Sequence, residues 1–258
     1  MPVLPRIKSV LYESPVYPVA RSCYEAIFKG STLREMNKMR RFYGQFFRPG
    51  EIVFDIGANV GEYSEVFASC GATVVAVEPQ PACCQSLYKL ARRAGVRVEP
   101  CAVGATTGVA QMHICDINVF STLNPEWVTC TEGFPSYQNA HWTETIDVPV
   151  VTVDNLVKRH GKPTFVKIDV EGFEDKVLEG MSFLPKFVSF EFNARLTHIA
   201  LRCLSMARMK KYRFNSIAGR KLEWHHLQWM SNDDAKIWLS HYHDEAEYGD
   251  LFGQLVVA

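Results

Sequence analysis

The chain has 258 residues, of which 47% are hydrophobic, enough to fill the core of one large α/β domain. Lys and Arg together number 28, as do Asp and Glu, so the formal net charge of +0 gives no overall field that would attract nucleic acid or an anionic membrane. The eight cysteines contain no C-x-x-C pair, and no apolar run approaches the ~18 residues of a membrane span. We therefore expect a soluble, cytoplasmic protein with reduced thiols, no structural zinc and no membrane span.

The first 48 residues are predicted to form an arm and helices that pack on the core. Residues 1–16 contain three prolines and lack the apolar run of a signal peptide, which indicates either an extended arm lying on the domain or a partly disordered one. Apolar residues at helical spacing between positions 19 and 47, interrupted at 30–32, predict two helices. Residues 49–258 are expected to form the main part of what is a single domain overall.

Strands and helices alternate from residue 52 to residue 98. Apolar runs at 52–56, 73–77 and 96–98 predict strands, and the segments 62–70 and 80–94 between them have helical periodicity. Strands joined in this way by crossover helices form half of a doubly wound parallel sheet. The pattern therefore predicts a Rossmann-like α/β fold.

The middle of the chain is less regular. Residues 109–115 and 145–153 are predicted strands that form an accessory β-pair. The segment 116–144 between them contains the aromatic residues Phe120, Trp127, Phe134, Tyr137 and Trp142. A loop of this length in a compact domain is either a lid or binding element, or a variable surface insertion.

Regular elements return after residue 163. Apolar runs predict strands at 164–169, 187–192, 212–217 and 250–258, and helical periodicity predicts helices at 173–180, 194–210 and 235–243. No internal repeat or low-complexity tract interrupts the pattern. Together with the earlier strands, these elements give an open, mostly parallel seven-stranded sheet with helices on both faces.

The segment after the first strand reads Asp55-x-Gly57-x-Asn59-x-Gly61, which points to a nucleotide-like ligand. Glycines there bring bare backbone to a ligand, but the spacing is neither the G-x-G-x-x-G of dinucleotide-binding proteins nor a P-loop. Glu78 ends the second strand 23 residues after Asp55 (78 − 55), where its carboxylate can accept hydrogen bonds from both ribose hydroxyls. A ribose without a pyrophosphate, and with a cationic end near Asp55, describes S-adenosylmethionine.

Six segments form an ordered set of motifs between residues 52 and 192. They read FDIGANVGEY, VVAVEPQP, PCAVG, VTVDNL, VKIDVEGFEDKVLEGM and FVSFEF. This set resembles the FkbM family of S-adenosylmethionine-dependent methyltransferases, and VKIDVEG is its most specific part. The resemblance implies a class I methyltransferase fold with the sheet order 3-2-1-4-5-7-6. It also implies methyl transfer, usually to a hydroxyl oxygen of a sugar, a lipid or a secondary metabolite.

The resemblance further implies which residues hold the cofactor. The glycine loop would hold the methionine end and the ribose, the acidic residue after the second strand would hold the ribose hydroxyls, and the segment after the third strand would line the adenine. Asp169, at the end of a later strand, would lie beside both cofactor and acceptor. The cofactor-binding residues expected on this basis are Asp55, Gly57, Ala58, Asn59, Gly61, Glu78, Pro79, Ala102, Val103 and Asp169, with Cys101 beside them.

An alcohol acceptor loses its proton as its oxygen attacks, so a base or an orienting group is expected near the transferred methyl group. The candidates for this catalytic role are Asp169, Glu171 and Lys167. A metal is not expected to be required. The alternative arrangement, that of some catechol-type O-methyltransferases, would place Mg²⁺ on Asp169, Glu191 and Asn193, whose oxygen atoms suit a hard cation.

Other possibilities stay open at this point. Histidine side chains titrate near neutral pH and could act as bases. The pair His225-His226 either lines a substrate pocket or packs at the surface. None of the candidate histidines lies in a family segment, and the other candidates are His198, His241 and His243. The neutral charge and the absence of base-methylating motifs predict a small hydroxylated acceptor rather than nucleic acid. The alternative functions are a non-catalytic S-adenosylmethionine-binding module and a Rossmann NAD(P) oxidoreductase. Neither the acceptor nor the oligomeric state follows from the sequence.

Overall fold

The computed structural model describes residues 33–131, 137, 139–242 and 248–256. The chain divides into two compact units, Met1–Phe42 and Tyr43–Ala258. In the first unit, the described residues 33–42 are helical, whereas the arm and the helix predicted before residue 30 lie outside the described residues. The predicted division after residue 48 stays a prediction.

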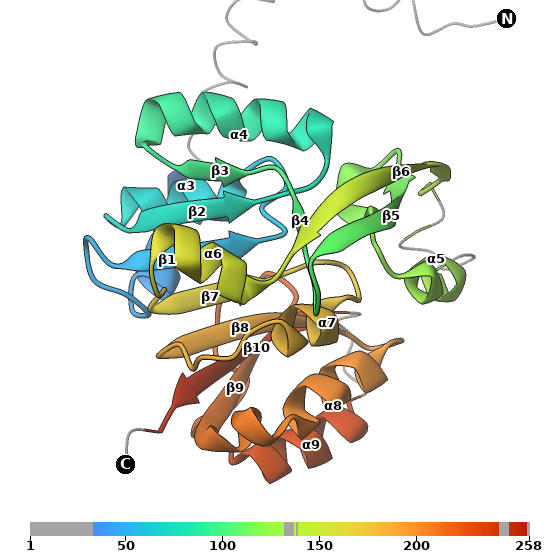
Figure 1. Ribbon diagram of the computed structural model, residues 1–258. Coiled ribbons are helices and arrows are strands. Elements are labelled where there is room, and N and C mark those ends of the chain that lie inside the picture. The colour runs from blue at the N-terminus through green and yellow to red at the C-terminus, as the bar shows by residue number, and fades with distance from the viewer. Residues whose placement is uncertain (1–32, 132–136, 138, 243–247, 257–258) are drawn as a thin grey trace, which may run out of the picture. The chain divides into compact units, whose positions relative to one another are not determined.

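The main sheet of the second unit has seven strands (Figure 1). In chain order they are β1 (Ile52–Ile56), β2 (Thr73–Val77), β3 (Arg97–Glu99), β7 (Phe165–Ile168), β8 (Phe187–Asn193), β9 (Tyr212–Ala218) and β10 (Tyr248–Leu255). Their order across the sheet is β3-β2-β1-β7-β8-β10-β9, and only β10 runs antiparallel to its neighbours. This is the order 3-2-1-4-5-7-6, so the predicted fold class is confirmed. The carboxyl ends of β1, β2, β7 and β8 therefore meet at one edge, where ligands bind in open α/β sheets.

Seven helices lie along this sheet or join its strands. They are α3 (Glu62–Ser69), α4 (Pro81–Ala94), α6 (Val153–His160), α7 (Glu174–Glu179), α8 (Thr197–Ser205), the 3-10 helix η3 (Ala207–Lys211) and α9 (Asn232–Ser240). Because side chains alternate along a strand, Phe54, Val166 and Phe190 pack on one face with apolar residues of α6 to α9. On the opposite face, the ring of Phe165 lies 5.1 Å from that of Phe46 and 5.7 Å from that of Phe67. Both faces of the parallel strands are covered, as their continuous apolar runs require.

A smaller sheet follows the order β4-β6-β5, with β4 (Ala102–Val103), β5 (Gly108–Cys115) and β6 (Trp142–Val151). It lies on the side toward which β1 and β2 point (Figure 1). The predicted accessory pair is therefore a three-stranded sheet, because the residues after β3 pair with the end of β6. The predicted loop at 116–144 contains the 3-10 helix η1 (Asn118–Phe120) and α5 (Pro125–Thr131), and its residues 132–136 and 138 lie outside the described residues.

Several predicted elements differ from the structure by a few residues in their bounds, among them α9 and β10, and two differ more strongly. The strand expected to run to residue 153 ends at Val151, and α6, which was not predicted, begins at once. Thr152 accepts a hydrogen bond from the backbone N–H of Asn155, whose side chain in turn accepts from the Thr152 N–H, so a capping box starts the helix inside a β-branched run. The helix predicted at 194–210 breaks at Met206, whose extended backbone separates α8 from η3. None of the helices in the described part of the chain has the length and apolarity needed to cross a membrane.

Candidate functional site

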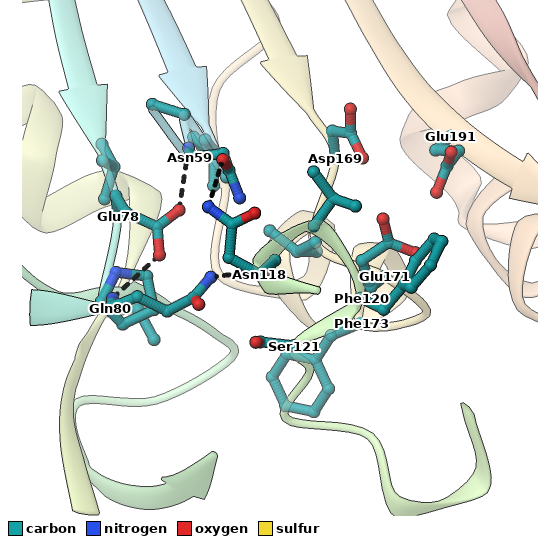
Figure 2. Close-up of a pocket in the computed structure, with 18 of the residues that line it drawn as sticks. Asn59, Glu78, Gln80, Asn118, Phe120, Ser121, Asp169, Glu171, Phe173 and Glu191 are labelled. Atoms are coloured by element: carbon teal, nitrogen blue, oxygen red, sulfur yellow. Dashed lines mark hydrogen bonds between the residues drawn. The ribbon is translucent and has the colours of Figure 1, made fainter. Parts of the chain in front are cut away.

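A cavity of about 410 Å³ lies at the carboxyl ends of β1, β2, β7 and β8. Residues of η1 and of the β4-β6-β5 sheet also line it, so the predicted loop at 116–144 contributes to its wall. Figure 2 shows the labelled lining residues on both sides of this space. The cavity is where the strand order and the glycine loop both predict a ligand.

The loop after β1 approaches the end of β7 so closely that only glycine fits at its first position. Gly57 has a φ of +83°, and a Cβ atom built there would lie 1.7 Å from the backbone oxygen of Asp169. The backbone N–H groups of Gly57 and Ala58 both donate to the carbonyl of Val77 at 3.0 Å. The loop is thereby fixed to β2 on one side and to β7 on the other, and its backbone is exposed to the cavity.

Glu78 follows β2 and receives two backbone hydrogen bonds (Figure 2). The Asn59 N–H donates to Oε2 at 2.9 Å, and the Gln80 N–H donates to Oε1 at 2.8 Å. Burial raises the pKa of this carboxyl to about 7, although the hydrogen bonds from Gln80 and Asn59 act in the opposite direction. An ionised Glu78 is therefore an acceptor fixed at the cavity wall, with lone pairs left for further donors.

Asn118 of η1 closes the cavity beside Glu78. Its amide group donates to Oδ1 of Asn59 at 3.1 Å, and its backbone carbonyl accepts from the amide group of Gln80 at 3.1 Å (Figure 2). Sequence reasoning gave neither Asn118 nor Gln80 a role, although Gln80 lies within the segment VVAVEPQP; Asn118 lies in none of the quoted segments. A segment far along the chain is thus joined to the glycine loop.

Asp55 and Gly61 do not line the cavity, although both were predicted to bind the cofactor. The Asp55 carboxylate is buried behind the loop, where it accepts a hydrogen bond of 2.6 Å from the hydroxyl of Ser64. Burial raises its pKa, although Lys167 and the Ser64 hydrogen bond act in the opposite direction. Gly61 precedes α3 with a φ of +95°, and a Cβ atom there would lie 2.8 Å from the side chain of Leu87. Both residues shape the loop from behind.

The other predicted cofactor residues line the cavity. Pro79 lies next to Glu78 in the chain, and the segment after β3 also forms part of the wall. The predicted cofactor residues found in the lining are Gly57, Ala58, Asn59, Glu78, Pro79, Ala102, Val103 and Asp169, together with Cys101.

Lys167 is fully buried and reaches Asp169 rather than the cavity. Its ammonium donates to Oδ2 of Asp169 at 2.6 Å and lies 4.1 Å from the ring centre of Tyr63. Burial lowers the pKa of the lysine, but the charge of Asp169 and of Asp250 outweighs it, so the pKa is raised well above its usual value. Lys167, a predicted catalytic residue, therefore holds Asp169 in place and has no access to a ligand in this cavity.

Three carboxyl groups meet at the far side of the cavity from Glu78 (Figure 2). One oxygen from each of Asp169, Glu171 and Glu191 lies within 4.8 Å of the others. Glu171 has a left-handed backbone with a φ of 55°, and the hydroxyl of Thr122 donates to its carbonyl at 2.6 Å. Burial, and then the charge of Asp169 and neighbouring glutamates, raises the pKa of both Glu171 and Glu191 well above the usual value. Of these two glutamates, only Glu171 was predicted to be catalytic.

The alternative metal set of Asp169, Glu191 and Asn193 is not brought together at the cavity. The Asn193 amide donates to the hydroxyl of Tyr137 at 3.2 Å and its oxygen accepts from the backbone of Arg195 at 2.9 Å, away from the two carboxylates. Glu171 stands where the amide was expected, and carboxylate oxygens also suit a hard cation. The expected metal independence stays a prediction.

The candidate histidines lie elsewhere. Among the described residues, no histidine lines the cavity. The rings of His225 and His226 lie 4.7 Å apart and pack against Trp238, while His198 contacts Glu126 at 3.2 Å. His241 is exposed at the end of α9, and His243 lies outside the described residues.

Comparison of the sequence with known proteins finds relatives among methyltransferases. Residues 55–236 match the methyltransferase FkbM domain. A protein from Streptomyces tacrolimicus named 31-O-demethyl-FK506 methyltransferase FkbM is 32% identical over 163 residues, which cover 54% of this chain and 62% of that protein. A protein from Haloferax volcanii named hexuronic acid methyltransferase AglP is 26% identical over 168 residues, 64% of each. The chain thus spans less than two thirds of the length of these relatives.

Among solved structures, a TehB-like SAM-dependent methyltransferase from Corynebacterium glutamicum superposes with a TM-score of 0.44 and 11% identity. The superposition covers 93% of this chain and 100% of that one.

Proposed function

Because the chain belongs to the FkbM family of methyltransferases, we propose that it transfers the methyl group of S-adenosylmethionine to a hydroxyl oxygen of a small molecule. The observation that carries this proposal is Glu78, a carboxylate held by two backbone N–H groups at the cavity wall next to the Gly57 loop. The sulfonium of S-adenosylmethionine supplies an activated methyl group when bound.

The residues present fit this cofactor. Gly57 lets the loop backbone pack against the end of β7 and line the cavity, and Glu78 keeps acceptor capacity for the two ribose hydroxyls. Cys101, Ala102 and Val103 offer an apolar wall for the adenine. We assign the methionine end to the loop from Gly57 to Asn59, which leads toward Asp169.

The acceptor is proposed to be a small hydroxylated molecule, in keeping with the names of both relatives. One is named for a demethylated form of FK506 and the other for hexuronic acid. Asp169 lies between the glycine loop and the two glutamates, where it would orient the acceptor oxygen toward the methyl group. Orientation of this kind supplies a large part of the rate of a displacement reaction.

The test is methyl incorporation from S-adenosylmethionine labelled in its methyl group, using a panel of sugars, lipids and macrolides with RNA included. We expect label in one or more hydroxylated small molecules and none in RNA. Binding is measured in parallel with S-adenosylhomocysteine and with NAD(H). Tight NAD(H) binding without S-adenosylhomocysteine binding would point to an oxidoreductase, whereas S-adenosylhomocysteine binding without incorporation into any panel member would point to a non-catalytic module.

Affinity for S-adenosylhomocysteine is expected to depend on the ionisation of Glu78. With a pKa of about 7, the carboxyl of the ligand-free protein is only about one-tenth ionised at pH 6, so affinity should be about tenfold weaker at pH 6 than at pH 8. In Glu78→Gln, one backbone donor faces an amide N–H group, so binding at pH 8 should weaken by about 1–3 kcal/mol and the pH dependence should disappear. Isothermal titration calorimetry at both pH values measures this. A pH dependence that persists in Glu78→Gln would assign it to another group.

A further inference from the structure

Glu171 and Glu191 form a pair of carboxyl groups that the assignment of cofactor residues leaves unused. Glu171 reaches the cavity from the turn after β7, and Glu191 reaches it from β8 (Figure 2). Two different elements therefore bring the carboxyl groups together, with an oxygen of each within 4.8 Å of the other and of Asp169. Their place is the end of the cavity away from Glu78, where the acceptor would enter.

The turn that carries Glu171 is held in an unusual conformation. Its φ of 55° lies in the left-handed region, which disfavours a residue other than glycine. The hydroxyl of Thr122 donates to the Glu171 carbonyl, and the amide of Asn124 donates to the Gly172 carbonyl at 2.8 Å. Glu174 accepts from the backbone N–H groups of Val170 and Gly172, both at 3.2 Å. These contacts fix the direction in which the Glu171 side chain leaves the turn.

Asp169 is less suited than this pair to receive a proton. Its Oδ2 atom is bound to the buried ammonium of Lys167, so a proton added to that carboxylate would oppose a buried ion pair. By contrast, the part of the chain that the structure describes gives neither the Glu171 nor the Glu191 carboxyl a hydrogen-bond donor or a cationic partner. Their raised pKa values agree with this, because each carboxyl group is half-buried and lies beside other acidic groups.

We propose that the Glu171–Glu191 pair accepts the proton of the acceptor, and that the acceptor group is therefore a hydroxyl rather than a carboxylate. This inference rests on the proposed function and assigns its base. Glu191 is thereby a catalytic residue that the sequence did not suggest as a base. When two carboxyl groups share one proton, one of them can accept a hydrogen bond and the other can donate one. A hydroxyl group can both donate and accept a hydrogen bond, so it fits between them.

The acceptor oxygen forms a bond to the methyl carbon while the bond from that carbon to sulfur breaks and its electron pair stays on sulfur. The hydroxyl proton passes to the singly protonated Glu171–Glu191 pair, and it is then released to solvent. The acceptor becomes a methyl ether, and the positive charge leaves with the proton. A carboxylate with a raised pKa is a stronger base than an ordinary one, which suits this transfer.

The charges around the pair disfavour a carboxylate acceptor. Among the described residues that line the cavity, Arg220 carries the one positive charge, and its guanidinium pairs with Glu62 at 2.5 Å. A carboxylate placed near Asp169, Glu171 and Glu191 would meet like charge, and it would have no proton to give up. A hydroxyl group meets hydrogen-bond acceptors there instead.

The kinetic test compares Glu171→Gln and Glu191→Gln with Glu179→Gln, using an acceptor found in the labelled panel. Glu179 lies on the surface of α7, where it pairs with Lys176 at 2.7 Å, so its variant should behave like the unmodified protein. We expect kcat to fall about 10²-fold or more in each cavity variant, with little change in cofactor affinity. The kcat of the unmodified protein should rise with pH to a plateau. This rise of kcat with pH should be absent from both Glu171→Gln and Glu191→Gln. Retention of kcat within about threefold in Glu191→Gln would overturn the proposal.

The product and the metal requirement give independent outcomes. Mild alkali hydrolyses a methyl ester to methanol but leaves a methyl ether intact, so the label should stay with the acceptor. Release of labelled methanol would mean that a carboxylate is methylated, and the proposal would fall while methyl transfer stands. Activity abolished by EDTA and restored by Mg²⁺ would likewise overturn it, because the carboxylates would then bind the cation.

An NMR titration of the carboxyl groups without acceptor tests the Glu171–Glu191 pair independently of the proposed methyl transfer. In protein labelled with ¹³C at the glutamate side-chain carboxyl carbon, Glu78 and Glu174, whose pKa values burial raises to about 7, also titrate above the usual glutamate range. We therefore identify the pair by the loss of one further signal of this kind in each cavity variant. Ionisation of both groups below pH 5 would overturn the proposal whatever the acceptor assay shows. Lack of any methylated panel member, with the titration as expected, would count against the proposed function instead.

Discussion

Replacing Asp169 with asparagine is expected to lower kcat about 10³-fold or more. The carboxylate lies between the glycine loop and the Glu171–Glu191 pair, so its loss removes both a charge and the group that we propose to orient the acceptor. The substitution also leaves the buried ammonium of Lys167 without its closest anion. Single-turnover rates with labelled S-adenosylmethionine measure the effect on chemistry, and calorimetry with S-adenosylhomocysteine shows whether cofactor binding survives.

A double variant separates the chemical effect from the effect on stability. Asp169→Asn alone should lose at most about 3 kcal/mol of unfolding free energy, the lower end of the cost of breaking a buried pair, because the Asp55 and Asp250 carboxylates stay near Lys167. Adding Lys167→Met removes the buried charge and should restore part of that stability. Activity should not return. If the double variant regains turnover, Asp169 acts only through folding and has no role in the reaction.

Gly57→Ala is expected to be the most damaging glycine-to-alanine change among the described glycines, because its Cβ atom would make the shortest contact. The added Cβ atom would lie 1.7 Å from the backbone oxygen of Asp169, so the loop after β1 must move away from the end of β7. Overpacking costs about 1–3 kcal/mol or more, and a left-handed alanine adds about 1–2 kcal/mol. We expect a loss of about 3–5 kcal/mol in urea unfolding. Binding of S-adenosylhomocysteine should weaken about 100-fold or more, since the displaced loop also carries Asn59.

Gly95→Ala is the matched control for this prediction. Gly95 also has a positive φ of +71°, but a Cβ atom there meets nothing within 4 Å. Its substitution should cost only the backbone term of about 1–2 kcal/mol and leave cofactor affinity unchanged. Equal effects of the two substitutions would mean that backbone strain, rather than contact with Asp169, decides the cost at Gly57.

The sequence was sufficient for the main sheet because its strands are local apolar runs with distinct ends. The same regularity identified the residues at those ends, among them Glu78 and Asp169. The prediction failed at α6, because the Thr152 capping box lies within a β-branched run. A hydrophobic strand that continues directly into a helix shows no change in polarity at the boundary. The prediction also failed at Met206, because nothing in the helical periodicity of 194–210 marks the break.

The residues of the candidate site could be predicted only where their position at the end of a strand was enough to place them at the cavity. Asp55 fits the motif, but whether its side chain faces the cavity or the core depends on strand alternation, and Asp55 faces Ser64 in the core. The contact between Asn59 and Asn118 joins residues 59 positions apart, so no local pattern could reveal it. The nearness of Glu171 and Glu191 depends on the left-handed turn after β7, which no residue type there requires.

The segment that follows β5 touches both halves of the cavity. Asn118 binds the glycine loop beside Glu78, and four residues later Thr122 holds the carbonyl of Glu171. A ligand that orders the contact between Asn118 and the glycine loop also orders the segment that carries Thr122. It thereby lowers the entropy cost of ordering the contact between Thr122 and Glu171. The two substrates should therefore bind with positive cooperativity, each raising the affinity for the other by the same factor, as linkage requires.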